Sequence, residues 1–103
     1  MRCIYTPTVS YIHFEWDENK NRLNLRKHGV SFEEAQTVFF DPNARVIHDP
    51  DHSEYEDRFI ILGTSRRLRL LVVCHSYLAE EDLIRIISAR RATKEEIAYF
   101  GGI

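Results

Sequence analysis

Four apolar segments between residues 44 and 89 constrain the fold of the chain more than any other feature. They read "ARVIH", "RFIILGT", "LRLLVVCHS" and "DLIRIISA", and short polar turns such as "SRR" and "LAEE" separate the last three. Strands joined by short connections pair with their chain neighbours as an antiparallel meander. The segment "LRLLVVCHS" is apolar on both of its faces, so we expect it to be the central strand.

Two helices are predicted before these strands. Asp17 caps the segment "ENKNRLNLRKH", and Gly29 ends it, because glycine adopts the left-handed conformation after a helix at little cost. The segment "SFEE" is a capping box, with Ser31 at the N-cap and Glu34 three residues later. The turn residues "DPN" stop this second helix near Phe40. We therefore expect a hairpin-like pair of short helices.

The two ends of the chain complete the predicted order of elements. The alternating segment "IHFEW" adds a strand before the helices, and residues 1–11, which show no clear period, are expected to be an extension preceding one domain of residues 12–103. A second capping box, Thr93 with Glu96, opens a short final helix that ends at Gly101. The result is an α+β domain with an antiparallel sheet whose helices cover only one face.

Composition limits the class of protein. A chain of 103 residues fits one domain that needs no cross-link, and Cys3 and Cys74 lie in unlike contexts that predict neither a disulfide nor a metal pair. No segment resembles a membrane helix or a secretory signal, so we expect a soluble, cytoplasmic protein. The formal net charge is −2, but residues 63–94 hold seven Lys and Arg against three Asp and Glu. Any nucleic acid is expected to bind there.

Three arginines near the end of the chain are the main candidates for a site. Arg85 lies in an apolar strand, and Arg90 and Arg91 follow it immediately before a helix start. Guanidinium groups bind phosphate through two parallel hydrogen bonds, and a helix N-terminus also attracts anions. The three residues therefore predict a phosphate site. The simpler alternative is that Arg85 is only an exposed residue on the solvated face of the sheet.

Other candidates have equally simple structural explanations. Lys27 and His28 end the first helix, where cations complement the helix dipole, although a histidine also suits proton transfer. His75 is either a satisfied sheet histidine or a site residue. The segment "HDPDHSE", with His48 and His52, has no second ligand cluster, so a solvated turn explains it better than a metal site.

The series "FEWDENKNRLNLRKHGVSFEEA", "FFDP", "DRFIILG" and "RIISARRATKEE" resembles the BrnT toxins of bacterial type II toxin–antitoxin systems, over about residues 14–100. The resemblance implies a compact, RelE-like ribonuclease that needs no metal or cofactor. It also implies neutralisation by a BrnA antitoxin, a small protein with a DNA-binding ribbon–helix–helix portion, through which alone the toxin would reach operator DNA.

Residues of this chain match the family's motifs one by one. Lys27 and His28 fall on its "KHG" segment, Arg58 opens its "RF" strand, and Arg85, Arg90 and Arg91 fall on its terminal "R-x-x-S-x-R-R" segment.

The leading hypothesis is an endoribonuclease in which the 2′-hydroxyl of the RNA attacks the adjacent phosphate. His28, or else His75, transfers a proton, and the three terminal arginines stabilise the phosphate. Lys27, Arg58 and His75 are the expected RNA-binding residues. The alternative is a non-catalytic module that binds the antitoxin and acts with it as a transcriptional co-repressor.

Overall fold

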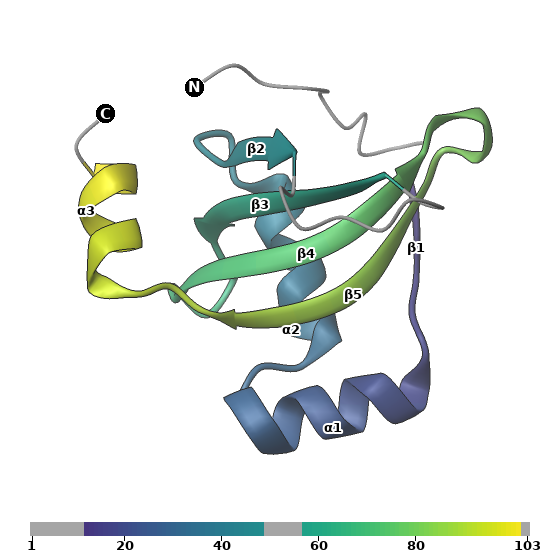
Figure 1. Ribbon diagram of the computed structural model, residues 1–103, viewed down its shortest axis with the longest axis horizontal. Coiled ribbons are helices and arrows are strands. Elements are labelled where there is room, and N and C mark those ends of the chain that lie inside the picture. Colours follow the sequence, from purple (N-terminus) through teal and green to yellow (C-terminus); the bar gives the residue numbers. More distant parts are fainter. Residues whose placement is uncertain (1–11, 49–56, 102–103) are drawn as a thin grey trace.

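A computed structural model describes residues 12–48 and 57–101 of the chain (Figure 1). The expected extension, residues 1–11, and most of the "HDPDHSE" segment lie outside these ranges. The elements, in chain order, are β1 (His13–Glu15), α1 (Glu18–His28), α2 (Phe32–Gln36), the 3-10 helix η1 (Thr37–Phe40), β2 (Arg45–His48), β3 (Arg58–Thr64), β4 (Leu70–Leu78), the 3-10 helix η2 (Ala79–Glu81), β5 (Leu83–Arg91) and α3 (Lys94–Gly101). None of the described helices is long and apolar enough to span a membrane.

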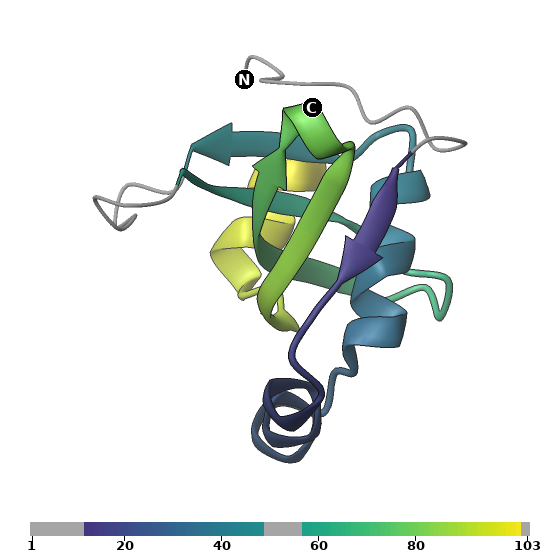
Figure 2. The same ribbon diagram turned by 90° about the vertical axis from the view of Figure 1, so that its right-hand side faces the viewer.

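The five strands form one mixed sheet in the order β1-β5-β4-β3-β2. Strands β2 to β5 make the expected antiparallel meander, and β4 is its centre, as predicted. The prediction of a wholly antiparallel sheet is wrong, because β1 pairs in parallel with β5, with Phe14 opposite Ile84 (Figure 2). This pairing joins residues about 70 positions apart, so no local turn signal in the sequence could have predicted it.

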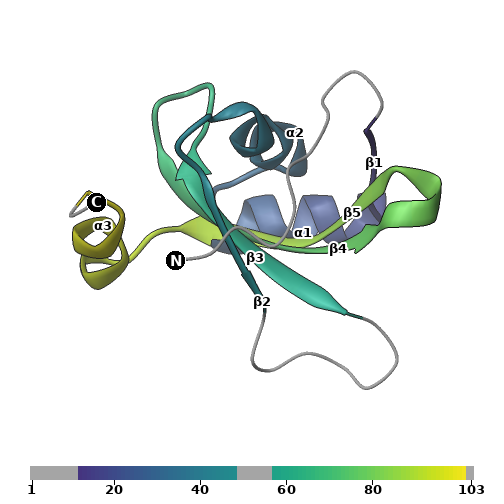
Figure 3. The same cartoon turned by 90° about the horizontal axis from the view of Figure 1, so that it is seen from above.

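One face of the sheet carries the hydrophobic core. Helix α2 and η1 lie against it, behind the sheet in Figure 1. Phe32 of α2 is fully buried among strand residues such as Ile84 and Ile86, and burying a side chain of this size contributes about 1.5–3 kcal/mol. Helix α3 stands apart from α1 and α2 (Figures 1 and 3) and lies over the opposite face of the sheet, where Tyr99 faces Leu62 and Val72. The expectation that the helices cover only one face is therefore wrong.

Helix α1 docks through amide groups rather than through apolar side chains. The buried Asn24 donates to the backbone oxygens of Val30 and Ala89 at 2.8 Å each, and its own oxygen accepts from the Ala89 N–H at 3.1 Å. Asn21 accepts from the Phe32 N–H at 2.8 Å. These bonds attach α1 to β5 and to the start of α2, so a weakly amphipathic helix still has a defined position.

The predicted helix ends are confirmed with two corrections, the first being that the α-helix opened by Ser31 ends at Gln36 and continues to Phe40 only as the 3-10 helix η1. Asp17 accepts hydrogen bonds from the Asn19 and Lys20 N–H groups, and Gly29 adopts the left-handed conformation with φ 71°. Ser31 accepts from the Glu34 N–H, but the Glu34 carboxylate does not reach back to Ser31, so this capping box is only half formed. The box formed by Thr93 and Glu96 is complete, with bonds in both directions.

Candidate active site

A β-bulge in β5 decides which arginines share a face of the sheet. His75 of β4 lies opposite Ile86, whereas its neighbour Cys74 lies opposite Ser88, so Ile87 is an extra residue in β5. Side chains alternate between faces along a strand, and an extra residue reverses the alternation beyond it. Arg85 and Arg90 therefore lie on the same face, although one residue number is odd and the other is even.

We call this surface the arginine face, because it carries four arginines on the side of the sheet opposite α2. Its residues form three rows across the strands. They are Arg45, Leu62, Val72 and Arg90; then Ile47, Ile60, Cys74 and Ser88; then Arg58, Ser76, Arg85 and Glu15. The first and third rows are about 13 Å apart along β4, since four residues of strand separate them. The face is therefore cationic at both ends and mostly apolar between them.

Arg90 is fixed in place by α3. Its Nη1 and Nη2 groups donate to the two carboxylate oxygens of Glu96 at 2.8 and 2.9 Å, the bidentate geometry expected of a strong pair. These hydrogen bonds lower the pKa of Glu96 to about 2, so the pair stays ionised at any ordinary pH. The Glu96 carboxylate also accepts from the Thr93 N–H, which ties Arg90 to the first turn of α3.

Arg58 and Arg85 lie on either side of Ser76, and their Cα atoms are about 10 Å apart across two strand spacings. The Arg85 Nε donates to Glu15 at 2.6 Å in a half-exposed ion pair. The Arg58 Nε is buried and has no hydrogen-bond partner among the described residues. A buried N–H without a partner is costly, so Arg58 is a group that an anionic ligand would satisfy.

Three of the residues predicted from sequence lie elsewhere. Lys27 and His28 are exposed at the end of α1. Arg91 pairs with Leu71, which is buried on the core side, so its side chain points away from the arginine face. The structure thus brings together Arg58, Arg85 and Arg90, and it does not bring Lys27, His28 or Arg91 to them.

His75 is an interior residue with no exposed surface. Its ring lies 4.7 Å from the Phe39 ring in an edge-on arrangement, and its Nδ1 is 3.2 Å from the Val73 carbonyl oxygen. Burial lowers the pKa of His75 to about 4, because the charged imidazolium is poorly solvated there. A histidine with no exposed surface does not fit the expectation that His75 contacts RNA. Its position fits the other interpretation, a buried sheet histidine whose polar atoms are satisfied inside the protein.

The buried His75 predicts a specific loss of stability in mild acid. The unfolded chain binds a proton near the ordinary histidine pKa of 6.5, whereas the folded chain resists it until about pH 4. Folding stability should therefore fall by about 2 kcal/mol between pH 7.5 and pH 5 through this group alone. Urea unfolding of wild type and His75→Gln at both pH values measures the effect. An equal acid loss in both proteins would contradict it.

The sequence interpretation missed residues of the arginine face. Arg45 and Glu15 belong to it, His13 lies on the same side of the sheet one row beyond it, and none was singled out. The signal for His13 and Glu15 was present in "IHFEW", where they alternate with apolar residues, so both had to share the solvated side of the strand. His13 is exposed, and it is the histidine that the alternation places on the same face as Arg85.

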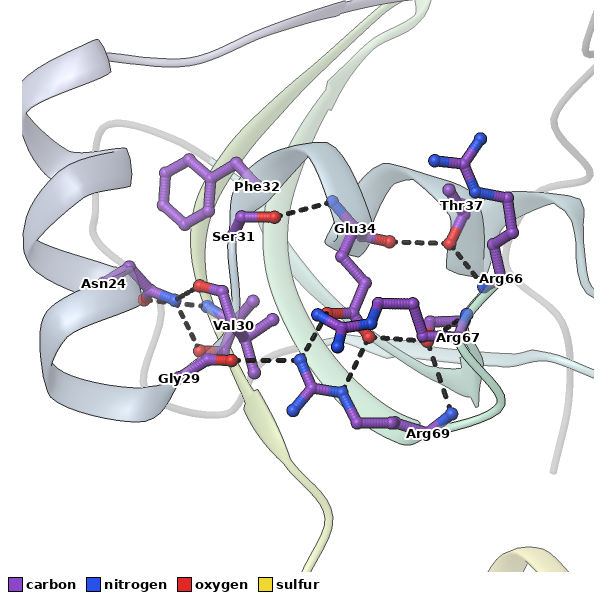
Figure 4. A network of polar contacts seen from close by, with 12 residues as sticks. Asn24, Gly29, Val30, Ser31, Phe32, Glu34, Thr37, Arg66, Arg67 and Arg69 are labelled. Carbon is purple, nitrogen blue, oxygen red and sulfur yellow. Dashed lines mark hydrogen bonds and ion pairs between the residues drawn. The ribbon is translucent and has the colours of Figure 1, made fainter.

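A second polar cluster surrounds Glu34, whose side chain is only 5% exposed (Figure 4). Arg69 binds both carboxylate oxygens, with its Nε at 2.9 Å, and the Ser65 hydroxyl donates to the same carboxylate at 2.7 Å. Arg69 also donates to the Gly29 carbonyl at 3.0 Å. The hydrogen bond from Arg69 is the main cause that keeps the pKa of Glu34 below its usual value. This cluster joins α2 to the β3–β4 turn, which is a structural role.

The described residues offer no group of three or more His, Cys, Asp or Glu side chains placed to hold a metal ion. Of the "HDPDHSE" segment only His48 is described, and its ring stacks on Phe59 at 4.9 Å. What the arginine face does offer is spaced, permanently charged guanidinium groups. Such groups bind phosphates and stabilise the charge that develops when a phosphate is attacked.

Fold and site together define a small α+β protein whose sheet presents a cationic face suited to a polyanion. A protein-family model described as the ribonuclease toxin BrnT of type II toxin–antitoxin systems matches residues 16–96. The chain therefore belongs to the BrnT family of ribonuclease toxins, as the sequence motifs predicted, and its class implies an RNA target and an antitoxin partner.

A solved structure supports the fold. The chain is similar to the Brucella abortus ribonuclease toxin BrnT, whose crystal structure was determined at 1.1 Å resolution, with a TM-score of 0.61 and 24% identity. The similarity covers 81% of this chain and 99% of the Brucella chain. The search of curated proteins gave no match.

Proposed function

We propose that this chain is a metal-independent endoribonuclease that inhibits growth in the cytoplasm by cleaving RNA across its arginine face. Membership of a ribonuclease toxin family supports the activity. The observation that carries the assignment of the site is the bulge in β5, which aligns Arg85 and Arg90 on the face that also holds Arg58. Bulges next to active sites commonly redirect a side chain in this way.

In the proposed reaction the 2′-hydroxyl oxygen of one nucleotide attacks its own 3′-phosphate. A bond forms between this oxygen and phosphorus, and the bond from phosphorus to the 5′-oxygen of the next nucleotide breaks. The products are a 2′,3′-cyclic phosphate and a 5′-hydroxyl. The hydroxyl proton leaves to a base, the 5′-oxygen receives a proton, and Arg58 and Arg85 stabilise the extra charge on the phosphate.

His13 is the proton-transfer residue that the geometry favours. It is exposed, it lies on the same side of the sheet as Arg85 two residues from Glu15, and an imidazole ring has one nitrogen that can accept a proton and one that can donate. His28 at the end of α1 and the buried His75 have no comparable position.

The proposed partner is a BrnA-type antitoxin with a ribbon–helix–helix portion. Binding of an acidic antitoxin segment over the arginine face would block the RNA and explain neutralisation. The complex would contact operator DNA through the antitoxin.

Cleavage of a synthetic RNA by the purified protein with excess chelator tests the proposal. We expect 2′,3′-cyclic phosphate and 5′-hydroxyl ends at a rate that the chelator does not change. RNA bound tightly but left intact would indicate the competing function, a non-catalytic antitoxin-binding co-repressor. Cleavage that stops with chelator and returns with a divalent cation would instead contradict metal independence.

A further inference from the structure

An apolar pocket of about 140 Å³ lies between α3 and the arginine face. Ile47, Ile60, Leu62 and Val72 form its floor from three adjacent strands, and Tyr99 of α3 lines it from the other side. Arg45 and Glu96 are its two charged lining residues, and Glu96 is held by Arg90. Ile47 is 39% exposed, although it is a large apolar residue on a sheet. Apolar walls bind an apolar group, and the cationic surface around them binds anions. The pocket therefore suits a ligand in which an apolar group is joined to anionic groups.

Two planar groups border this pocket. The guanidinium carbon of Arg45 lies 5.8 Å from the centre of the Tyr99 ring, within the range of a cation–π contact but longer than the roughly 3.5–4.0 Å of tightly stacked atoms. Tyr99 is 51% exposed, so much of its surface remains open. Aromatic rings and guanidinium planes are the groups on which proteins stack unpaired RNA bases.

The pocket has the size of one aromatic ring system. A cavity of about 150 Å³ with apolar walls binds benzene in another protein, whereas whole drug-sized ligands need pockets of about 300 Å³ or more. The pocket therefore fits one base and leaves the attached sugar and phosphate outside. Arg90 shares a row with Leu62 and Val72, so a guanidinium group borders the pocket where that phosphate would lie.

We infer that this pocket binds one base of the RNA substrate, stacked on Tyr99 and beside Arg45, with its phosphate near Arg90. The inference rests on the proposed function and adds a subsite to it. Arg58 and Arg85, which hold the scissile phosphate in the proposed reaction, lie about 13 Å away along the sheet. The base in the pocket therefore belongs to a nucleotide next to the cleavage point. Charge favours RNA as the occupant, because two arginines, Arg45 and Arg90, flank the pocket against the single carboxylate of Glu96.

A base analogue scan tests the subsite without relying on cleavage. The probes are 2′-fluoro oligonucleotides of one sequence, which lack the attacking hydroxyl, each with fluorescent 2-aminopurine at a different position. At one position the wild-type protein should quench the fluorescence by stacking. Tyr99→Ala should abolish that quenching and weaken binding about tenfold to a hundredfold, whereas Tyr99→Phe should retain both. Ile97→Ala is the matched control, because Ile97 is 50% exposed on the same helix and does not line the pocket.

Quenching at no position, or equal quenching by wild type and Tyr99→Ala, would overturn the inference. So would a Tyr99→Ala protein that loses affinity for the antitoxin but binds the oligonucleotides normally, since the pocket would then serve a protein partner. Cleavage of unmodified RNA, measured in parallel, separates the two proposals. Cleavage without quenching would leave the proposed function standing alone, and quenching without cleavage would leave only the binding site.

Discussion

Arg85→Ala is expected to reduce the rate of RNA cleavage by about 10²–10³-fold, far more than the roughly tenfold loss expected of Arg90→Ala, because the Arg90 side chain lies about 13 Å from the scissile phosphate and binds a neighbouring one. Removing one positioned donor from a site that stabilises developing charge typically has the larger effect. Lysine at either position should restore only part of the rate, because an ammonium keeps the charge but loses the two-pronged geometry. The measurement is the single-turnover cleavage rate of one RNA, with the melting temperature of each variant recorded beside it.

Arg91→Ala is the matched control for this prediction. It removes the same side chain from the neighbouring position, but that side chain points to the opposite face of the sheet. We expect its cleavage rate to stay within a few-fold of wild type. If Arg91→Ala lost as much activity as Arg90→Ala, or if Arg85→Ala cleaved normally, the arginine face would not be the active site.

Glu34→Ala is expected to lower the free energy of unfolding by about 3 kcal/mol, because it leaves the guanidinium of Arg69 without its partner in a partly buried position. For a domain of this size the melting temperature should fall by roughly 10–20 °C. Glu34→Gln should cost less, since an amide can still accept from Ser65 and Arg69. Chemical denaturation at pH 7 measures the difference.

Glu33→Ala is the control for the charge and for the helix. Glu33 lies next to Glu34 in α2 but is exposed and accepts a single hydrogen bond, from Asn21 at 2.9 Å. Its replacement should cost less than about 1 kcal/mol.

Glu34→Ala and Arg69→Ala should also be strongly non-additive in their effects on the free energy of unfolding, because each removes the same ion pair. Additive losses would show that the two side chains stabilise the fold independently.

Local signals predicted the local parts of this fold. Asp17, Gly29 and Ser31 ended or began helices as expected, because caps depend on residues a few positions apart. The meander and its central strand followed from short turns. Glu34 shows the limit, since a capping box has the same spacing whether its carboxylate bonds the N-cap or an arginine 35 positions later.

The candidate site was predicted only in part, for a geometric reason. Strict alternation along β5 would have placed Arg85 with Arg91, whereas the extra residue Ile87 places it with Arg90. A bulge depends on how the partner strand pairs, so "LIRIISARR" does not reveal it. The parallel pairing of β1 is equally non-local, and it brings His13 and Glu15 to the site from the other end of the chain.

The position of β5 between β1 and β4 has a consequence for how the toxin arises during translation. Strand β1 is synthesised early, yet its partner in the sheet is the last strand to leave the ribosome. Until β5 emerges, β1 has no strand to pair with, and Arg85 and Arg90 are not yet in the sheet. Domains generally fold as units during synthesis, so the step that completes the sheet is also the step that creates the arginine face. A chain ending before residue 83 would thus lack both the partner strand of β1 and two of the four arginines of the arginine face.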